Sequence, residues 1–145
     1  SRAELDEADF PPCKALADQP WAMTAHVLYP ALDKNECATN SKTIIAGIVR
    51  GALGFKGALM SDDLSMKALN GSFEHRARTC RAAGCDIALH CNGDRAEMAG
   101  GAKGAGTLAG ESLARYRAAL VHRAPEALDP AAALARLAAL LAPVA

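Results

Sequence analysis

Three short apolar runs, at 22–27, 57–61 and 85–90, constrain the fold of this chain more than any other feature of the sequence. Each run is followed by a segment with helical patterning, and the runs recur about every thirty residues. This alternation is typical of right-handed βαβ units, which place their strands in a parallel sheet. Parallel strands are buried on both faces, which explains why the runs are continuously apolar. The sequence therefore predicts an α/β fold.

Helix signals separate the three runs. Apolar residues at 44, 45, 48, 49 and 52 predict a helix over 42–53, with Ser41 as its N-cap and Gly54 at its end. Residues 3–17 form a mildly amphipathic start that we expect Pro11 and Pro12 to break. Further helices are expected at 73–83, from about 95 after Asp94, at 111–122 and at 130–141, and the glycine-rich stretch 100–110 is expected to be a loop or a weak helix.

Chain length limits what three strands can build. The chain has 145 residues, whereas a (β/α)8 barrel needs about 250. A parallel sheet of only three strands leaves two edges unpaired. The chain is therefore either a small open α/β domain or part of a barrel. In the second case we expect the isolated chain to be poorly stable, or to associate through its exposed strand edges.

Composition narrows the classes of partner. Lys plus Arg and Asp plus Glu number 16 each, so the balance of charge predicts no nucleic-acid or anionic membrane partner. No apolar run approaches the roughly 18–20 residues of a membrane span, and residues 1–10 do not have the pattern of a signal peptide. The five cysteines are an odd number without a C-x-x-C pair. They are expected to be reduced and mostly buried, in a cytoplasmic protein.

Polar residues follow the apolar runs at the points where the strands should end. His26 lies near the end of the first run, Ser61, Asp62 and Asp63 end the second, and His90 and Asn92 end the third. Sites in α/β folds gather at the carboxyl ends of parallel strands. One shared site at this edge of the sheet is therefore expected.

Each of these residues also has a structural interpretation. Ser61, Asp62 and Asp63 could cap a helix, and His26 could be a hydrogen-bonded core histidine. His90 beside Cys91 could be a metal-binding pair, although the sequence has no second ligand pair at a zinc spacing.

Other titratable residues are expected at the surface. They are His75 and His122 on predicted helices, and Glu4, Asp6 and Asp9 on a solvated helical face.

Several linked motifs together resemble one enzyme family. They are GFKGALMSDDLSM at 54–66, MTAHV at 23–27, ATNS at 38–41, AGCD at 83–86 and LHCNGD at 89–94. In this order they resemble family-three glycoside hydrolases, and most closely the bacterial β-N-acetylhexosaminidases that recycle peptidoglycan. The resemblance covers residues 2 to 100, and the remaining residues fit the family's closing helices.

The resemblance implies a fold and a set of roles. Residues 1–145 would be the C-terminal three β/α units of a (β/α)8 TIM barrel, a partial barrel without a second domain. Asp62 would be the nucleophile of a retaining β-N-acetylglucosaminidase (EC 3.2.1.52), forming a glycosyl–enzyme intermediate. His26 and Met23 would lie near the sugar. Ser61, Asp63, His90 and Asn92 would support the site. The resemblance implies no metal and no organic cofactor.

Two elements that the family uses do not occur in these 145 residues. They are a D-x-H loop that supplies the acid/base and a Lys-His-Phe-x-Gly-His segment that binds the sugar. Loss of general acid help alone typically costs about 10²–10⁴-fold in rate. We therefore expect this chain to be inactive in isolation and to require the missing N-terminal barrel half. With that half, its substrate would be an N-acetylglucosamine-containing muropeptide sugar.

Two other functions remain open from the sequence. The first is a non-catalytic α/β sugar-binding or interaction module derived from a barrel fragment. The second is a metal-dependent hydrolase that uses His26, Asp62, Asp63 and His90.

Overall fold

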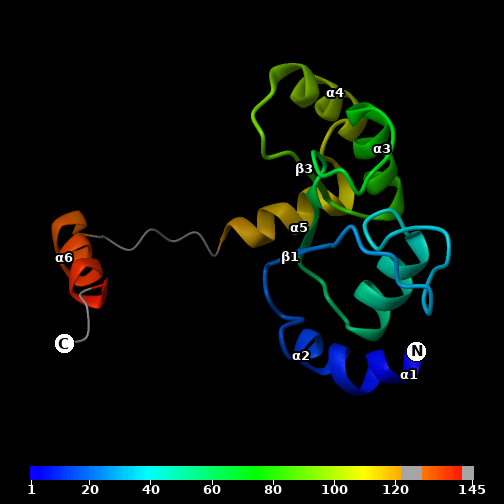
Figure 1. The fold of residues 1–145 in the computed structure, drawn as a ribbon, viewed down its shortest axis with the longest axis horizontal. Coiled ribbons are helices and arrows are strands. Elements are labelled where there is room, and N and C mark those ends of the chain that lie inside the picture. Colours follow the sequence, from blue (N-terminus) through cyan, green and yellow to red (C-terminus); the bar gives the residue numbers. More distant parts are fainter. Residues whose placement is uncertain (122–128, 142–145) are drawn as a thin grey trace.

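The computed structural model describes residues 1–121 and 129–141. The described elements begin with three short helical segments, α1 (Arg2–Glu4), the π-helix η1 (Leu5–Asp9) and α2 (Phe10–Ala15). The order then runs β1 (Trp21–Met23), the π-helix η2 (Ile44–Ala52), β2 (Ala58–Asp63), α3 (Phe73–Ala83), β3 (Ile87–Leu89), α4 (Arg95–Ala105), α5 (Gly110–Leu120) and α6 (Pro130–Leu141). Figure 1 shows α3 and α4 side by side, with the N-terminal helices at the opposite end of the view.

The three strands form one parallel sheet in the order β1-β2-β3, which confirms the predicted α/β class. Met23 of β1 is in register with Met60 of β2, and Met60 with Ile87 of β3. The pairing of β2 with β3 is irregular between Met60 and Asp63. With β2 in the centre, one edge of β1 and one edge of β3 have no strand partner among the described residues.

The strand ends differ from the prediction because tertiary hydrogen bonds set them. β1 ends at Met23 rather than at residue 27, since the hydroxyls of Thr24 and Thr39 bond at 2.8 Å and draw the chain into a loop. β3 is also shorter than the predicted 85–90. Its predicted first residue, Cys85, donates its backbone N–H to the carbonyl of Cys80 at the end of α3. β2 is longer than predicted and continues through Asp63.

The core lies on the face of the sheet that carries η2 and α3. Leu59 from β2, Ile45 from η2 and Cys80 from α3 are all at most 2% exposed. The buried cluster contains Ile45, Phe55, Leu59, Leu64, Leu69, Ala77, Cys80, Ala83 and Cys85. Small side chains at Ala77 and Ala83 allow α3 to pack closely on the sheet.

Several helix ends agree with the sequence signals. Ser41 Oγ accepts the backbone N–H of Ile44 at 3.0 Å, which confirms it as an N-cap. Asp94 caps α4 by accepting the N–H of Glu97 at 2.9 Å. α3 has the predicted bounds, and Gly84 ends it at a φ of +120°. The helix predicted over 42–53 is present, but most of it, η2, is a π-helix and not an α-helix. Its hydrogen bonds span five residues, as when the N–H of Leu53 donates to the carbonyl of Ile48 at 2.8 Å.

The N-terminal prolines do not break the helical start, so that prediction is wrong. Pro11 and Pro12 lie in the first turn of α2, where a missing N–H removes no helical hydrogen bond. Glu4, Asp6 and Asp9 are exposed, as predicted.

The environments of the cysteines and histidines differ from one residue to the next. All five cysteines are free thiols, but Cys13 and Cys91 are exposed, so the expectation of mostly buried cysteines is wrong. His75 is exposed as expected, and His122 lies outside the described residues. Among the helices at 1–121 and 129–141, none is long and apolar enough to cross a bilayer.

Candidate active site

The carboxyl end of β2 carries the residues with the strongest potential for chemistry. Asp62 is half-buried, and its Oδ1 accepts the backbone N–H of Asp63 at 2.8 Å. In the described part of the chain, no other group hydrogen bonds to the Asp62 carboxylate. One oxygen is thus held in place by the backbone, and the other is left free to react.

Ser61 is buried and links two strands. Its Oγ accepts the backbone N–H of Leu89 at 2.9 Å, which ties β2 to the end of β3. Ser61, Asp62 and Asp63 all lie within β2. The segment after them is a turn rather than a helix, so the helix-cap interpretation is wrong.

Asp63 organises the turn after β2. Its carboxylate accepts hydrogen bonds from the backbone N–H and hydroxyl of Ser65, and from the N–H of Cys91 at 3.1 Å. Burial opposes ionisation, but these hydrogen bonds and the nearby His90 together lower the pKa of Asp63. The Asp63 carboxylate is therefore engaged within the turn, whereas the Asp62 carboxylate accepts only the N–H of Asp63 among the described residues.

His26 bridges the loop after β1 and the end of β2. Its Nε2 lies 3.0 Å from the backbone carbonyl of Asp63, and its Nδ1 lies 2.8 Å from Thr39 Oγ1. A carbonyl oxygen only accepts, so Nε2 carries the proton. Both ring nitrogens are occupied, as in a structural histidine, yet the side chain is only half-buried. Met23 is 52% exposed at the neighbouring end of β1.

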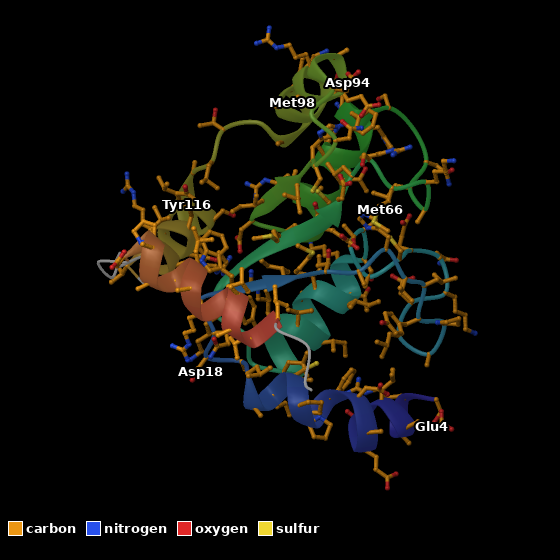
Figure 2. The ribbon with its side chains drawn as sticks, turned by 60° about the vertical axis from the view of Figure 1, so that its left-hand side comes forward. Glu4, Asp18, Met66, Asp94, Met98 and Tyr116 are labelled. Atoms are coloured by element: carbon orange, nitrogen blue, oxygen red, sulfur yellow. The ribbon has the colours of Figure 1, made fainter. Side chains whose placement is uncertain are left out.

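His90 and Asn92 turn toward α4 instead of toward Asp62. His90 Nε2 lies 2.9 Å from Glu97 Oε2, and its ring packs edge-on against Phe73 at a centroid distance of 5.2 Å. Asn92 Nδ2 donates to the same Glu97 oxygen. Figure 2 shows this end of the fold, with Asp94 and Met98 labelled on α4 and Met66 on the turn after β2.

The expected shared site is therefore divided into two linked groups. Asp62, Asp63 and His26 meet at the end of β2, whereas His90 and Asn92 gather around Glu97. The N–H of Cys91 connects the groups through the Asp63 carboxylate. Across the described ranges, no set of three or more His, Cys, Asp or Glu side chains is arranged to hold a metal. The pairing of His90 with Cys91 is not built as a ligand set.

Two residues of this network were not singled out from the sequence. Thr39 contacts both Thr24 and His26, and its signal is the ATNS motif in which it stands. Glu97 accepts from both His90 and Asn92, and its signal is an acidic residue three positions after the Asp94 N-cap.

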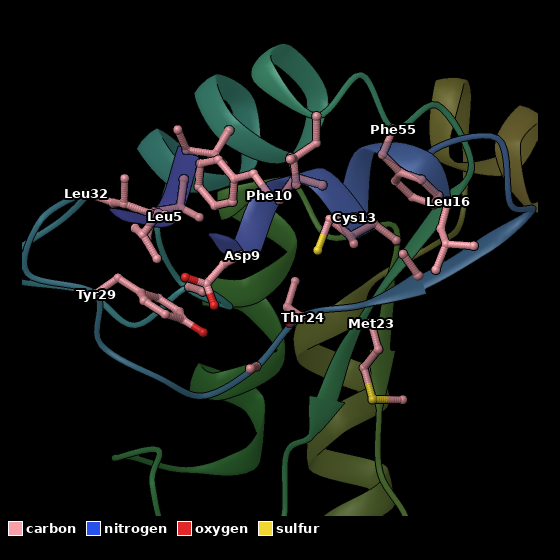
Figure 3. Close-up of a pocket in the computed structure, with 18 of the residues that line it drawn as sticks. Leu5, Asp9, Phe10, Cys13, Leu16, Met23, Thr24, Tyr29, Leu32 and Phe55 are labelled. Carbon is pink, nitrogen blue, oxygen red and sulfur yellow. The ribbon is translucent and has the colours of Figure 1, made fainter. Parts of the chain in front are cut away.

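A cavity of about 560 Å³ lies apart from this chemistry, along the open edge of β1. Its walls come from the N-terminal helices, β1 and η2, and include Leu5, Phe10, Leu16 and Phe55. Figure 3 shows these apolar side chains around the edge of β1, with Met23 and Thr24 at its rim. Asp62 does not line it. This cavity is an apolar groove beside an unpaired strand rather than a pocket around the carboxylates.

A parallel sheet with carboxylates at the end of its central strand is typical of α/β enzymes. Residues 1–115 match the Glycosyl hydrolase family 3 N terminal domain. The chain therefore belongs to glycosyl hydrolase family 3, which confirms the resemblance drawn from its motifs.

Individual relatives agree with this assignment. The Beta-hexosaminidase of Alkalilimnicola ehrlichii is 45% identical over 96 residues, which cover 63% of this chain and 27% of that protein. The family 3 β-N-acetylglucosaminidase of Paenibacillus sp. str. FPU-7 superposes with a TM-score of 0.73 and 30% identity, over 89% of this chain and 28% of that one. NagZ from Neisseria gonorrhoeae, solved in complex with N-trifluoroacetyl-D-glucosamine, superposes with a TM-score of 0.68 and 31% identity. The match covers 94% of this chain and 38% of the NagZ chain. The chain thus spans about a quarter of the length of the curated relative.

Proposed function

We propose that this chain carries the nucleophile of a retaining β-N-acetylglucosaminidase that acts on terminal β-linked N-acetylglucosamine in peptidoglycan-derived muropeptides. The observation that carries the proposal is the Asp62 carboxylate at the end of the central strand, with one oxygen held by the Asp63 N–H. The relatives of the chain support the class of sugar, because they include a Beta-hexosaminidase and a β-N-acetylglucosaminidase.

The proposed reaction uses the two Asp62 oxygens differently. The N–H of Asp63 holds Oδ1, so Oδ2 attacks the anomeric carbon as the bond to the leaving-group oxygen breaks. A general acid protonates that oxygen, and a glycosyl ester forms on Asp62. Water, deprotonated by the same group acting as base, then hydrolyses the ester, releasing the sugar with retained configuration.

The neighbours of Asp62 have supporting roles in this proposal. His26 holds the Asp63 peptide through its carbonyl, and Ser61 fixes β2 against β3. His26 and Met23 border the sugar, while His90 and Asn92 hold the β3–α4 loop against Glu97. The acid/base group is assigned to the rest of the barrel, outside these residues.

The groove along β1 supports the partial-barrel part of the proposal. An unpaired parallel strand beside an apolar cavity of about 560 Å³ fits the packing of a further β/α unit. We infer that residues 1–145 form the last three β/α units of one (β/α)8 domain. The isolated chain is then inactive, and the remaining barrel is the partner that completes its site.

A chimera tests this function directly. Residues 1–115 of this chain replace the matching segment of the Alkalilimnicola ehrlichii Beta-hexosaminidase, and release of the aryl group from an aryl β-N-acetylglucosaminide is measured. The chimera should hydrolyse the substrate with retention, and Asp62→Asn should lower kcat by about 10⁴–10⁶-fold, as expected for loss of a nucleophile. The matched control is Asp18→Asn at an exposed position, which should change kcat less than twofold. Sugar binding without hydrolysis would favour the non-catalytic module instead.

A further inference from the structure

The end of α3 brings two cysteines into one turn. Gly84, at a φ of +120°, donates its N–H to Arg81 O at 3.1 Å, and Cys85 donates its N–H to Cys80 O at 3.1 Å. This pair of bonds is the Schellman motif, in which the residues that correspond to Cys80 and Cys85 commonly contact each other through their side chains. In this chain both positions carry a thiol.

The turn that holds these thiols is firmly packed. Cys80 is 0% and Cys85 1% exposed, and both belong to the same buried cluster. A Cβ added to Gly84 would lie 2.9 Å from Cγ2 of Ile45, so the backbone of the turn is pressed against η2. The fold therefore holds Cys80 and Cys85 in fixed positions on either side of one tightly packed turn.

The two thiols have different surroundings. Cys80 Sγ donates to the carbonyl of Ala77 at 3.3 Å, and Cys85 Sγ donates to the carbonyl of Thr39 at 3.8 Å. The neighbouring Cys85 thiol lowers the pKa of Cys80, whereas the Cys80 thiol, together with burial, raises the pKa of Cys85. Cys80 is thus the thiol that more readily forms a thiolate, with Cys85 placed beside it as the resolving group.

We propose that Cys80 and Cys85 form a dithiol–disulfide pair that links the end of α3 to the start of β3 in response to hydrogen peroxide. The Cys80 thiolate attacks one peroxide oxygen and forms a sulfenic acid, and the departing hydroxide is protonated to water. The Cys85 sulfur then attacks the Cys80 sulfur, and the sulfenic hydroxyl leaves as a second water with the Cys85 proton. In sum, two thiols and one peroxide become one disulfide and two waters, and a small thiol reductant reverses the reaction.

The pair lies close to the strand that bears Asp62. Cys80 belongs to the same buried cluster as Leu59 of β2, two residues before Ser61, whose Oγ accepts the N–H of Leu89. The inference itself concerns the thiol pair and is independent of the glycosidase activity.

Peptide mapping of the oxidised 145-residue chain tests the pair. The folded chain is treated with hydrogen peroxide, its remaining thiols are alkylated, and it is digested with trypsin. Cleavage after Arg78, Arg81 and Arg95 places Cys80 in peptide 79–81 and Cys85 in peptide 82–95. The expected product is a disulfide-linked pair of these two peptides that separates on reduction.

Two controls make the assignment specific. Peptide 82–95 also contains Cys91, so Cys91→Ser should form the same linked pair, whereas Cys80→Ser should not. In guanidinium, which unfolds the chain, the Cys85–Cys91 and Cys80–Cys85 disulfides should form in comparable amounts, because the loops that they close differ in length by one residue. In the folded wild-type chain, Cys80–Cys85 should exceed Cys85–Cys91 by about tenfold or more, a selectivity that loop length alone does not produce. Equal pairing in the folded chain, or oxidation of Cys13 and Cys91 without a linked pair, would overturn the proposal.

Discussion

The backbone N–H of Asp63 donates a 2.8 Å hydrogen bond to Oδ1 of Asp62, so the residue after the proposed nucleophile also orients it. The Asp63 peptide is itself held at its carbonyl by His26, while the Asp63 side chain is held by Ser65 and by the N–H of Cys91. The hydrogen bonds at the end of β2 thus restrain Asp63, both its backbone and its side chain. Because the Asp63 N–H in turn holds Oδ1 of Asp62, the Asp62 carboxylate has one restrained oxygen and one free oxygen.

His26 should contribute to the stability of the fold through its hydrogen bond to the Asp63 carbonyl. His26→Ala removes the bonds to Thr39 and to the Asp63 carbonyl, so we expect a loss of about 1–3 kcal/mol in the free energy of unfolding. Urea denaturation followed by circular dichroism measures the change. His75→Ala on the exposed face of α3 is the control and should stay within about 0.5 kcal/mol of wild type. Equal effects of the two substitutions would contradict the bridging role of His26.

Asp86 should make stability depend on pH. Its side chain is 1% exposed and accepts from Arg50 at 2.7 Å, Arg115 at 3.1 Å and the backbone N–H of Leu59 at 2.9 Å. Burial opposes ionisation, but these hydrogen bonds, that from Ser112 and the charge of Arg50 outweigh it and lower the pKa of Asp86. A carboxyl whose pKa is lower in the folded state stabilises the fold above its unfolded pKa, about 3.9, and this contribution is lost as the pH falls through the folded pKa.

Asp86→Asn measures that contribution. At pH 7 the substitution should lower the free energy of unfolding by about 3–5 kcal/mol, because it leaves two arginines facing a neutral group. The difference from wild type should begin to shrink as the pH falls below about 4, where the carboxyl of the unfolded chain takes up a proton, and should be lost as the pH falls through the lower pKa of the folded state. Urea unfolding at pH 7, 5 and 3 gives the profile. A difference that stays constant over this range would mean that the charge of Asp86 is not what stabilises the fold.

Two glycines of α4 should respond oppositely to the same substitution. A Cβ on Gly104 would overlap the backbone carbonyl of Glu74 on α3, whereas a Cβ on Gly101 would meet no heavy atom within 4 Å. Gly104→Ala should therefore destabilise by about 1–3 kcal/mol through overpacking. Gly101→Ala should stabilise by about 0.5–1 kcal/mol through helix propensity. Paired thermal melts would show Tm shifts of opposite sign, and shifts of the same sign would contradict the close α3–α4 contact.

Local signals in the sequence predicted the parts of the fold that local interactions determine. The bounds of α3 and the N-caps at Ser41 and Asp94 follow from side chains that bond within three residues of themselves. The predicted ends of β1 and β3 were wrong because these ends depend on hydrogen bonds to other segments of the chain. Thr24 bonds to Thr39 in a later loop, and the N–H of Cys85 bonds back to α3.

The candidate site shows the same division between local and tertiary control. The carboxyl ends of parallel strands pointed to Asp62, and the motif resemblance assigned its role. The turning of His90 away from Asp62 could not be predicted, because it depends on how α4 places Glu97 and how α3 places Phe73. The π-type bonding of η2 likewise has no counterpart in the periodicity of residues 42–53.

The central claim is that Asp62 forms the covalent intermediate, and a mechanism-based fluorosugar tests it most directly. The active chimera is treated with an activated fluorinated N-acetylglucosamine, digested with trypsin and mapped by mass spectrometry. The cleavage sites Lys56 and Lys67 place Asp62 and Asp63 together in peptide 57–67, which fragmentation resolves into single residues. The account predicts one sugar on Asp62 and none after Asp62→Asn. A sugar on Asp63 or on another peptide, with Asp62→Asn still active, would contradict it.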